Sequence, residues 1–276
     1  MNTVFNLITE PFTYPFMQRA LMIAVVTGMV CALLSCYLVL KGWSLMGDAI
    51  SHAVLPGIVL AFLLGIPLSI GAFASGIFCA FATGYIKENS RVKQDTVMGI
   101  VFSGMFALGL VLFSTVDTDQ HLSHILFGHI LGVKISEFHQ TLWISGVTFF
   151  VMLLKRKDFM LYCFDNNHAK VIGLPVTLLH YGLLCLLSLT IVASFQAVGV
   201  ILVIAMLIAP GMTALMLCQQ FHQMLIIASL VSVISCVSGI LLSFHIDGAT
   251  GPCIVIVQAV IFMTSLIYKQ INGIKK

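Results

Sequence analysis

Long apolar runs follow one another along almost the whole chain, separated by short polar segments. Nine of them have about the length at which a helix crosses a lipid bilayer, roughly 17–25 residues. They cover approximately residues 20–40, 45–64, 68–86, 97–116, 138–154, 176–195, 197–217, 224–244 and 252–268. Lipid offers the backbone no hydrogen-bonding partner, and the runs show no alternation of polar and apolar residues, so we expect helices rather than a barrel. The pattern predicts an all-α polytopic membrane protein of about nine transmembrane helices, with eight to ten as the range.

Composition supports this prediction. The 276 residues are 60% hydrophobic and 8% charged, with a mean hydropathy of +1.10, whereas a soluble domain carries about 25% charged residues. No segment between the runs is long enough for a soluble domain, so we expect residues 1–276 to form one transmembrane domain surrounded by lipid. The basic residues are scattered rather than gathered into a patch, which argues against nucleic acid as a partner. The 8 cysteines include no Cys-x-x-Cys and are interpreted as packed, reduced thiols.

The basic residues predict the orientation of the chain. With nine spans, one side of the membrane collects eleven of the 13 basic residues, namely Lys41, Lys87, Arg91, Lys93, Lys155, Arg156, Lys157, Lys170, Lys269, Lys275 and Lys276. Cytoplasmic loops carry such an excess, so this side is expected to face the cytoplasm and the N-terminus to face outward. Residues 1–18 contain two prolines and several aromatic residues, which predicts an N-terminal interfacial segment.

One acid and one histidine stand apart from the other charged and titratable residues. Among the 10 acidic residues and 9 histidines, Asp48 and His52 are the pair that lies well inside an apolar run. Their spacing of four places them on one face of a helix, one turn apart. An ionised group inside lipid is costly and is rarely kept without a use. Carboxylate oxygen and imidazole nitrogen suit Mn²⁺, Fe²⁺ or Zn²⁺, and the missing thiolate argues against a Cu⁺ site. We interpret the pair as a metal site. The alternatives are a hydrogen bond that merely fixes helix packing and an Asp48 carboxylate that is solvated at the cytoplasmic boundary, which Lys41 and Trp43 mark.

Pro56 frees a further candidate oxygen donor, the backbone carbonyl of His52. It follows His52 by four residues and has no N–H, so the His52 carbonyl loses its helical partner. Exposed carbonyls in broken helices recur in the ion sites of transporters. Gly47 and Gly57 bracket the segment and allow close approach of the backbone.

Two other histidines, His121 and His124, lie on the longest outward connection, residues 117–137. With Asp117 and Asp119 beside them they are candidates for a metal entry funnel. A solvated surface cluster is the simpler interpretation.

A short cytoplasmic helix is predicted over residues 165–175. Asp165 is a good N-cap, and Gly173 followed by Pro175 is a good stop. The chain has no Gly-x-x-x-x-Gly-Lys-Ser/Thr motif, so it does not itself cradle a nucleotide phosphate. If transport is driven by ATP, a separate ATPase must dock, and this helix is where we expect it.

Four segments resemble a known family. Trp43-Ser44-Leu45-Met46-Gly47-Asp48-Ala49-Ile50-Ser51-His52-Ala53-Val54-Leu55-Pro56-Gly57 resembles the signature of the ABC-3 metal permeases, which import zinc, manganese and iron. Residues 198–211 resemble the late transmembrane signature of that family, and residues 247–251 also fit. The 165–175 segment resembles its coupling helix, which contacts the ATPase, and the positions carried over are Asp165, Asn166, His168, Ala169 and Gly173. The resemblance extends over essentially the whole chain. Within the family, the sequence is most similar to the chelated iron/manganese branch.

This resemblance implies a permease of the bacterial inner membrane that is not itself an enzyme and holds no permanently bound cofactor. It also implies three partners: a cytoplasmic ATPase, a periplasmic metal-binding protein and a second permease chain in a homodimer or heterodimer. Asp48 and His52 occupy positions that line the metal path in this family. The expected cargo is Mn²⁺ or Fe²⁺, with Zn²⁺ as the alternative.

Two other classes of membrane protein are alternatives to this interpretation. A stand-alone, proton-coupled metal transporter predicts further carboxylates within the membrane, and Asp48 is the one clear case. A haem-bearing subunit of a redox enzyme needs histidines on facing helices, and His52 has no obvious interior partner in the sequence.

Overall fold

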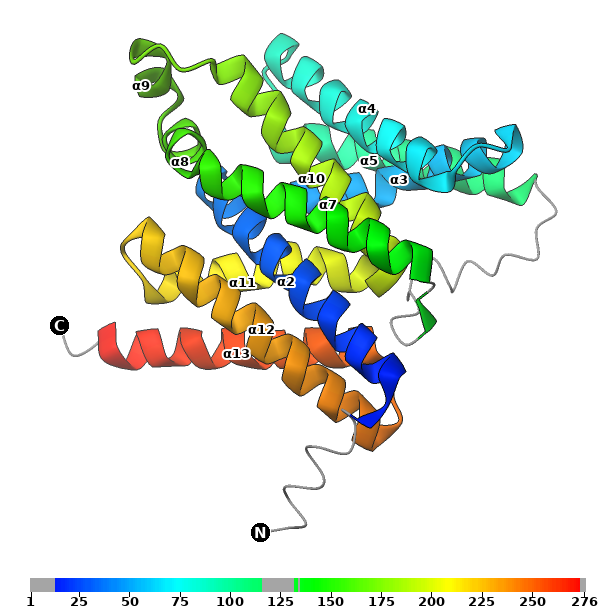
Figure 1. Ribbon diagram of the computed structural model, residues 1–276. Helices are drawn as coiled ribbons and strands as arrows, with labels where there is room; N and C mark the ends of the chain where they lie inside the picture. The colour runs from blue at the N-terminus through cyan, green and yellow to red at the C-terminus, as the bar shows by residue number, and fades with distance from the viewer. Residues whose placement is uncertain (1–12, 116–131, 134, 274–276) are drawn as a thin grey trace.

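The computed structural model describes residues 13–115, 132–133 and 135–273, and Figure 1 shows them as a helical bundle. This part of the chain contains no β-strand. In chain order its helices are α2 (Pro15–Lys41), α3 (Met46–Leu64), α4 (Leu68–Asn89), α5 (Gln94–Ser114), α7 (Ile135–Leu154), α8 (Arg156–Phe164), α9 (Asn166–Val171), α10 (Val176–Val198), α11 (Val200–Leu217), α12 (Phe221–Ile246) and α13 (Thr250–Gly273). The all-α fold predicted from the apolar runs is confirmed.

Eight of the described helices are long and apolar enough to cross a membrane, judged by length and composition. They are α2, α3, α4, α5, α10, α11, α12 and α13. Helix α7 is also long, with 20 residues, but Glu137 and His139 make its first turns polar. Its packing against the other helices indicates whether it lies within the same apolar layer.

Helix α7 lies beside α10 and runs antiparallel to it (Figure 1). Near one end, Thr141 donates a hydrogen bond to the carbonyl of Ala193 at 3.0 Å. Two turns further on, the hydroxyl of Thr190 lies 3.5 Å from that of Thr148. Because α10 is itself a candidate span, α7 extends across the same apolar layer. The eight candidate spans, with α7 packed along one of them, lie within the expected range of eight to ten.

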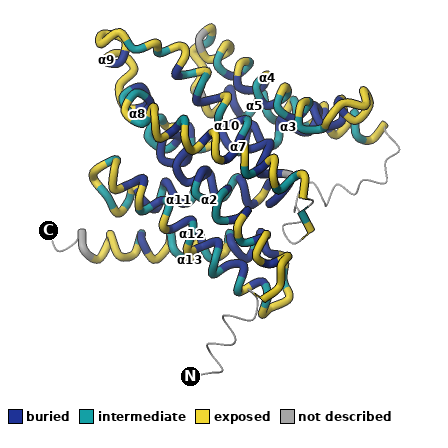
Figure 2. The backbone as a smooth tube through the Cα atoms, viewed as in Figure 1, coloured by how far each residue is buried: buried dark blue, intermediate teal, exposed yellow. Residues whose placement is uncertain are grey.

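Helix α2 is the central element of the bundle. Figure 2 shows it largely buried, and 72% of its most apolar window is enclosed by the rest of the chain, against 17% for α5. Helices α3, α4 and α5 pack together on one side of it, and α11, α12 and α13 on the other (Figure 1). The outer helices expose large apolar side chains such as Phe78, Val111 and Val260. In a membrane protein such a surface faces lipid or a partner chain.

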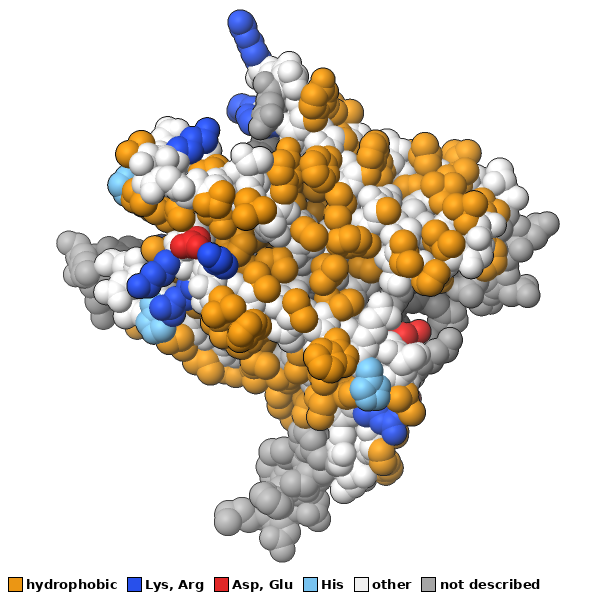
Figure 3. All heavy atoms as spheres, turned by 45° about the horizontal axis from the view of Figure 1, so that its top comes forward, with side chains coloured by type: hydrophobic (Ala, Val, Ile, Leu, Met, Phe, Trp, Pro, Cys, Tyr) orange, Lys and Arg blue, Asp and Glu red, His pale blue; other side chains and the backbone are white. Residues whose placement is uncertain are grey.

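Basic side chains gather at one end of the bundle. In Figure 3 they lie around the α8–α9 end of the visible face, whose broad middle is hydrophobic. The Lys41 ammonium at the end of α2 donates to the carbonyl of Tyr162 in α8 at 3.1 Å. Arg156 at the start of α8 lies 3.4 Å from a ring nitrogen of His222 in α12. The ends that the positive-inside rule assigns to the cytoplasm therefore meet in space.

Most helices begin or end within a few residues of the predicted runs, and two differences matter. Helix α2 begins at Pro15 rather than near residue 20, since proline is well suited to the first helical position. Residues 15–18 thus belong to a span, and residues 1–12 of the expected interfacial segment lie outside the described residues. Helix α8 was not expected. Its signal is the apolar spacing of Phe159, Tyr162 and Cys163, all of which are buried.

The crossing of α3 and α4 depends on two glycines. A Cβ added at Gly57 would collide with the carbonyl oxygen of Gly71 and would lie 2.5 Å from Cβ of Ser75. A Cβ at Gly71 would collide in turn with the Gly57 carbonyl. Small residues allow such close backbone contact between membrane helices. This contact holds the middle of α3 against α4.

We predict that Gly57→Ala lowers the free energy of unfolding by about 1–3 kcal/mol, because overpacking at a close crossing forces the backbones apart. Gly104→Ala in α5 is the matched control, since nothing lies within 4 Å of its added Cβ. The measurement is the temperature at which half of the detergent-solubilised protein loses its monodisperse peak in size-exclusion chromatography. Equal midpoints for the two variants would contradict the close crossing.

Candidate metal site and the segment that faces the cytoplasm

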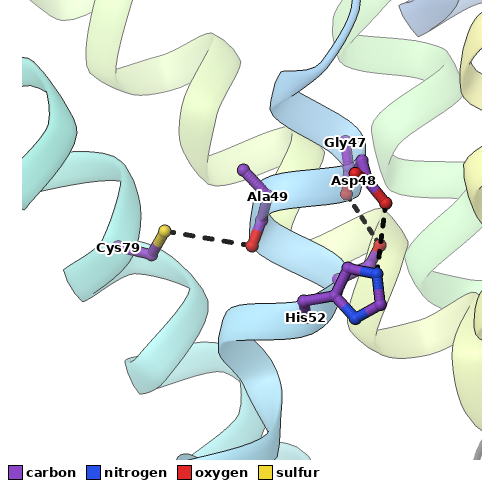
Figure 4. Close-up of polar contacts among 6 residues, drawn as sticks. Gly47, Asp48, Ala49, His52 and Cys79 are labelled. Atoms are coloured by element: carbon purple, nitrogen blue, oxygen red, sulfur yellow. Dashed lines mark hydrogen bonds and ion pairs between the residues drawn. The ribbon is translucent and has the colours of Figure 1, made fainter. Parts of the chain in front are cut away.

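Asp48 and His52 meet on one face of α3. The Oδ1 atom of Asp48 lies 3.3 Å from Nε2 of His52, and each side chain is 29% exposed (Figure 4). Asp48 is in the first turn of the helix, where the positive end of the helix dipole favours a carboxylate. The pair therefore lies in the first two turns of the span, at the boundary that Lys41 and Trp43 mark. Its partial exposure leaves both side chains accessible to an ion.

Aromatic rings of α5 cover His52. The centroid of Phe102 lies 5.9 Å from that of His52 in a stacked arrangement, and Phe106 meets the same ring edge-on at 5.2 Å. These residues were not singled out from the sequence, although their spacing of four on one helix face was a usable signal. They restrict the imidazole ring to a narrow range of orientations.

A small cavity adjoins His52, and Asp48 is not among its lining residues. It has a volume of about 20 Å³, which is room for about one water molecule. Its lining includes Phe106 from α5 together with Phe195 and Val200, which flank the break between α10 and α11. Gly199 alone separates these two helices and has a φ of +85°, a conformation open to glycine. The site thus borders a sharp turn between two spans.

Pro56 interrupts the hydrogen bonding of α3 just beyond His52. It is buried inside the helix and provides no N–H for the His52 carbonyl. Nearby carbonyls receive side-chain donors instead: Ser51 donates to Gly47 at 2.7 Å, and Ser75 donates to Ala53 at 2.6 Å. The His52 carbonyl stays a candidate oxygen donor.

The pair offers two side-chain donors and no more. Among the described residues no group of three or more His, Cys, Asp and Glu side chains is placed to hold a metal ion. His121 and His124 lie outside the described residues, as does most of the outward connection. The thiol of Cys79 points toward the Ala49 carbonyl at 4.0 Å, on the opposite face of α3 from His52 (Figure 4). Within the described part of the chain, the groups left to complete a metal site are backbone carbonyls.

The predicted cytoplasmic helix is present as α9. The Asp165 carboxylate accepts hydrogen bonds from the backbone N–H groups of Asn167 and His168 at 2.9 and 3.0 Å, so the expected N-cap is confirmed. Gly173 has a φ of +84°, as the expected stop requires. Asn166 and His168 are exposed. Ala169 is fully buried, so it seats the helix against the bundle and offers no surface to a partner.

Three apolar side chains near α9 are unusually exposed. Phe164, Val171 and Ile172 are 77%, 84% and 57% exposed. They lie on a segment outside the candidate spans, at the end where the basic residues gather. Such exposed apolar residues mark a contact surface.

These features define a class of protein: a polytopic helical membrane protein with a carboxylate–imidazole pair in a proline-interrupted span and an exposed connecting helix on its basic side. Comparison with known proteins identifies the family, because the model of the ABC 3 transport family matches residues 13–269. The chain belongs to this family and is a multi-pass protein of the inner membrane.

Its relatives are similar over their full length. The chain is 77% identical over 275 residues to the "Chelated iron transport system membrane protein YfeD" of Yersinia pestis, covering 100% of this chain and 93% of that protein. It is 50% identical over 267 residues to the "Manganese transport system membrane protein MntB" of Synechocystis sp., covering 97% and 87%. The structure of PsaBC from Streptococcus pneumoniae in complex with Fab matches with a TM-score of 0.85 and 37% identity, covering 95% of each chain.

We predict that Asp165→Ala raises the hydrogen–deuterium exchange rate of the Asn167 and His168 amides about fivefold, because loss of an N-cap costs about 1 kcal/mol. Asp158→Ala is the matched control. That carboxylate pairs with exposed Lys155 at 3.1 Å, and such surface pairs contribute little. Unchanged exchange in Asp165→Ala would contradict the observed cap.

Proposed function

We propose that this chain is the permease subunit of an ATP-driven importer of Mn²⁺ and Fe²⁺. The ion would pass from an external binding protein to the cytoplasm by alternating access, crossing the membrane beside Asp48 and His52. The observation that carries the proposal is the 3.3 Å contact between these two side chains in a span of an ABC 3 family member. The similarity to proteins described as iron and manganese transport membrane proteins supports the choice of cargo.

The donor set fits these ions. Carboxylate oxygen and imidazole nitrogen bind Mn²⁺, Fe²⁺ and Zn²⁺, whereas thiolates favour Cu⁺ and Zn²⁺. The thiol of Cys79 is turned away from the pair. Burial raises the pKa of the Cys163 thiol to about 12, so this cytoplasmic cysteine stays protonated and is a poor ligand at neutral pH. Zn²⁺ remains the alternative cargo because imidazole suits it well.

The incomplete coordination suits a transit site. Two side-chain donors and the His52 carbonyl hold an ion weakly, and an ion that must leave again requires weak binding. The side chains are partly exposed in the single chain, so a second permease chain placed against this face would add donors. We infer a dimer of permease chains on this ground, with identical or related partners.

ATP hydrolysis is assigned to a separate chain, because this sequence contains no P-loop motif. The exposed surface of α9 with Phe164, Val171 and Ile172 is where that ATPase would dock. Asp165 and Gly173 shape this surface, and Asn166 and His168 lie on it. The external binding protein would deliver the ion at the opposite end of the bundle.

We predict that Asp48→Ala and His52→Ala each abolish Mn²⁺ uptake in cells that depend on this chain, while the protein still reaches the membrane. Removing one of two side-chain ligands from a weak site leaves too few donors to replace the hydration shell of the ion. Asp95→Ala and His139→Ala are the matched controls, since both residues are exposed near helix ends. Normal uptake by Asp48→Ala and His52→Ala would refute the site.

A ligand exchange tests whether the pair touches the ion. We predict that Asp48→Cys shifts the ratio of Zn²⁺ to Mn²⁺ uptake toward Zn²⁺ at least about fivefold, because thiolate prefers the softer ion. The measurement is competitive uptake of Mn²⁺, Fe²⁺ and Zn²⁺ by proteoliposomes, with Asp48→Asn as the control that also removes the charge but adds no sulfur. An equal ratio in both variants would show that Asp48 does not coordinate the cargo.

A further inference from the structure

A cluster of four side chains, two of them buried and two half-buried, connects three helices at the end of the bundle where the basic residues gather. We call it the aromatic cluster, and it consists of Lys41, Trp43, Tyr162 and His180. The ammonium of Lys41 lies 3.9 Å from the ring centroid of Tyr162 and donates to the Tyr162 carbonyl at 3.1 Å. One cation is thus held by both the ring and the backbone at the end of α8, where the negative end of the helix dipole favours it.

Tyr162 continues the cluster toward α10. Its Oη atom lies 2.8 Å from Nδ1 of His180, and the indole of Trp43 meets the His180 ring edge-on at 5.2 Å. Tyr162 and Trp43 are 2% and 5% exposed. Burial raises the pKa of the Tyr162 phenol, so the hydroxyl keeps its proton and its hydrogen bond with the imidazole at physiological pH.

On one side the cluster is joined rigidly to the start of α3. The backbone N–H of Gly42 bonds to the Val39 carbonyl at 3.1 Å, and that of Trp43 bonds to the Leu38 carbonyl at 2.7 Å. With Gly42 at a φ of +75°, these bonds form a Schellman motif at the end of α2. The N–H of Met46, the first residue of α3, bonds to the Trp43 carbonyl at 3.0 Å. A displacement of Trp43 therefore reaches the helix turn that contains Asp48.

On the other side the cluster is joined to the segment proposed to contact the ATPase. Tyr162 is in the last turn of α8, three residues before Asp165, which caps α9. Figure 1 shows α8 and α9 at the same end of the bundle, beside the start of α10. Tyr162 therefore lies between the exposed α9 surface and the Asp48 turn.

We propose that Tyr162 is a positioning residue which, through Lys41 and Trp43, couples movement of α8 and α9 to the end of α3 that carries Asp48. The inference rests on the proposed function, because it assigns a transmission path to the same metal site. Tyr162 contacts neither the ion nor the ATPase in this assignment. The cluster acts as one unit because a half-buried cation–π contact and two hydrogen bonds resist separation of the three helices.

The test compares ions transported with ATP consumed. The chain and the ATPase that co-purifies with it are reconstituted in proteoliposomes with the Mn²⁺-loaded external binding protein, and Mn²⁺ uptake and phosphate release are measured together. We expect Tyr162→Leu and Lys41→Met each to lower the number of Mn²⁺ ions transported per ATP at least about fivefold, the lower range of allosteric coupling. Lys41→Arg, which keeps a cation over the ring, should retain most of the ratio.

Two controls separate coupling from packing. Tyr268→Leu makes the same change at a tyrosine that is 63% exposed on α13, and its ratio should equal that of the unmodified protein. The double variant Lys41→Met/Tyr162→Leu should be no worse than either single variant, because residues that act as one unit are not additive.

Several outcomes would overturn the inference. An unchanged ratio in Tyr162→Leu and Lys41→Met would do so, as would a double variant whose losses simply add. If Tyr162→Leu fails to fold, Lys41→Met and Tyr162→Phe decide the matter by the same ratio. If the unmodified protein with its ATPase transports no Mn²⁺, the proposed function fails first, and this result is distinct from a failure of coupling alone.

Discussion

A peptide group inside a lipid bilayer has no water to bond with, so every N–H and C=O there needs a partner within the protein. Helices satisfy this requirement locally, and several hydroxyl side chains of the spans follow the same rule. Thr27 donates to the Ile23 carbonyl at 2.6 Å, and Ser235 donates to the Val231 carbonyl at 2.7 Å, each within its own helix. A bundle built in this way has few polar groups left over for chemistry. Ionisable side chains within a span are therefore the informative ones.

Helix α3 departs from this rule in two places that lie one turn apart. Asp48 and His52 bring an acid and a base into the start of a span, and Pro56 removes a donor just beyond them. The surrounding helices support this irregular segment closely. A Cβ added at Gly109 of α5 would lie 2.9 Å from the backbone nitrogen of Pro56. Because glycine contacts hold both α4 and α5 against α3, the pair is presented by a rigid element, as a selective ion site requires.

In the proposed mechanism, the metal site and the α9 surface lie at the same, cytoplasmic side of the bundle. The short distance from Asp48 to the aromatic cluster means that an event at α9 does not have to cross the membrane to reach the metal site. Such an event only has to move the first turn of α3 relative to the end of α8. Small shifts of packed helices of this kind are a common form of coupling between distant partners.

The sequence by itself determined the features that depend on neighbouring residues. The apolar runs predicted the spans, the spacing of four placed Asp48 beside His52, and Asp165 with Gly173 predicted the bounds of α9, because hydropathy, helix period and capping act over a few residues. Tertiary structure decided what depends on residues far apart in the chain. Lys41 meets Tyr162 across 121 positions, the two glycines of the α3–α4 crossing face each other, and polar α7 is drawn alongside α10. Tertiary structure also decided the presence of helix α8, the aromatic rings around His52 and the exposure of the Asp48–His52 pair. These contacts depend on the shapes and directions of many side chains at once, which local pattern does not encode.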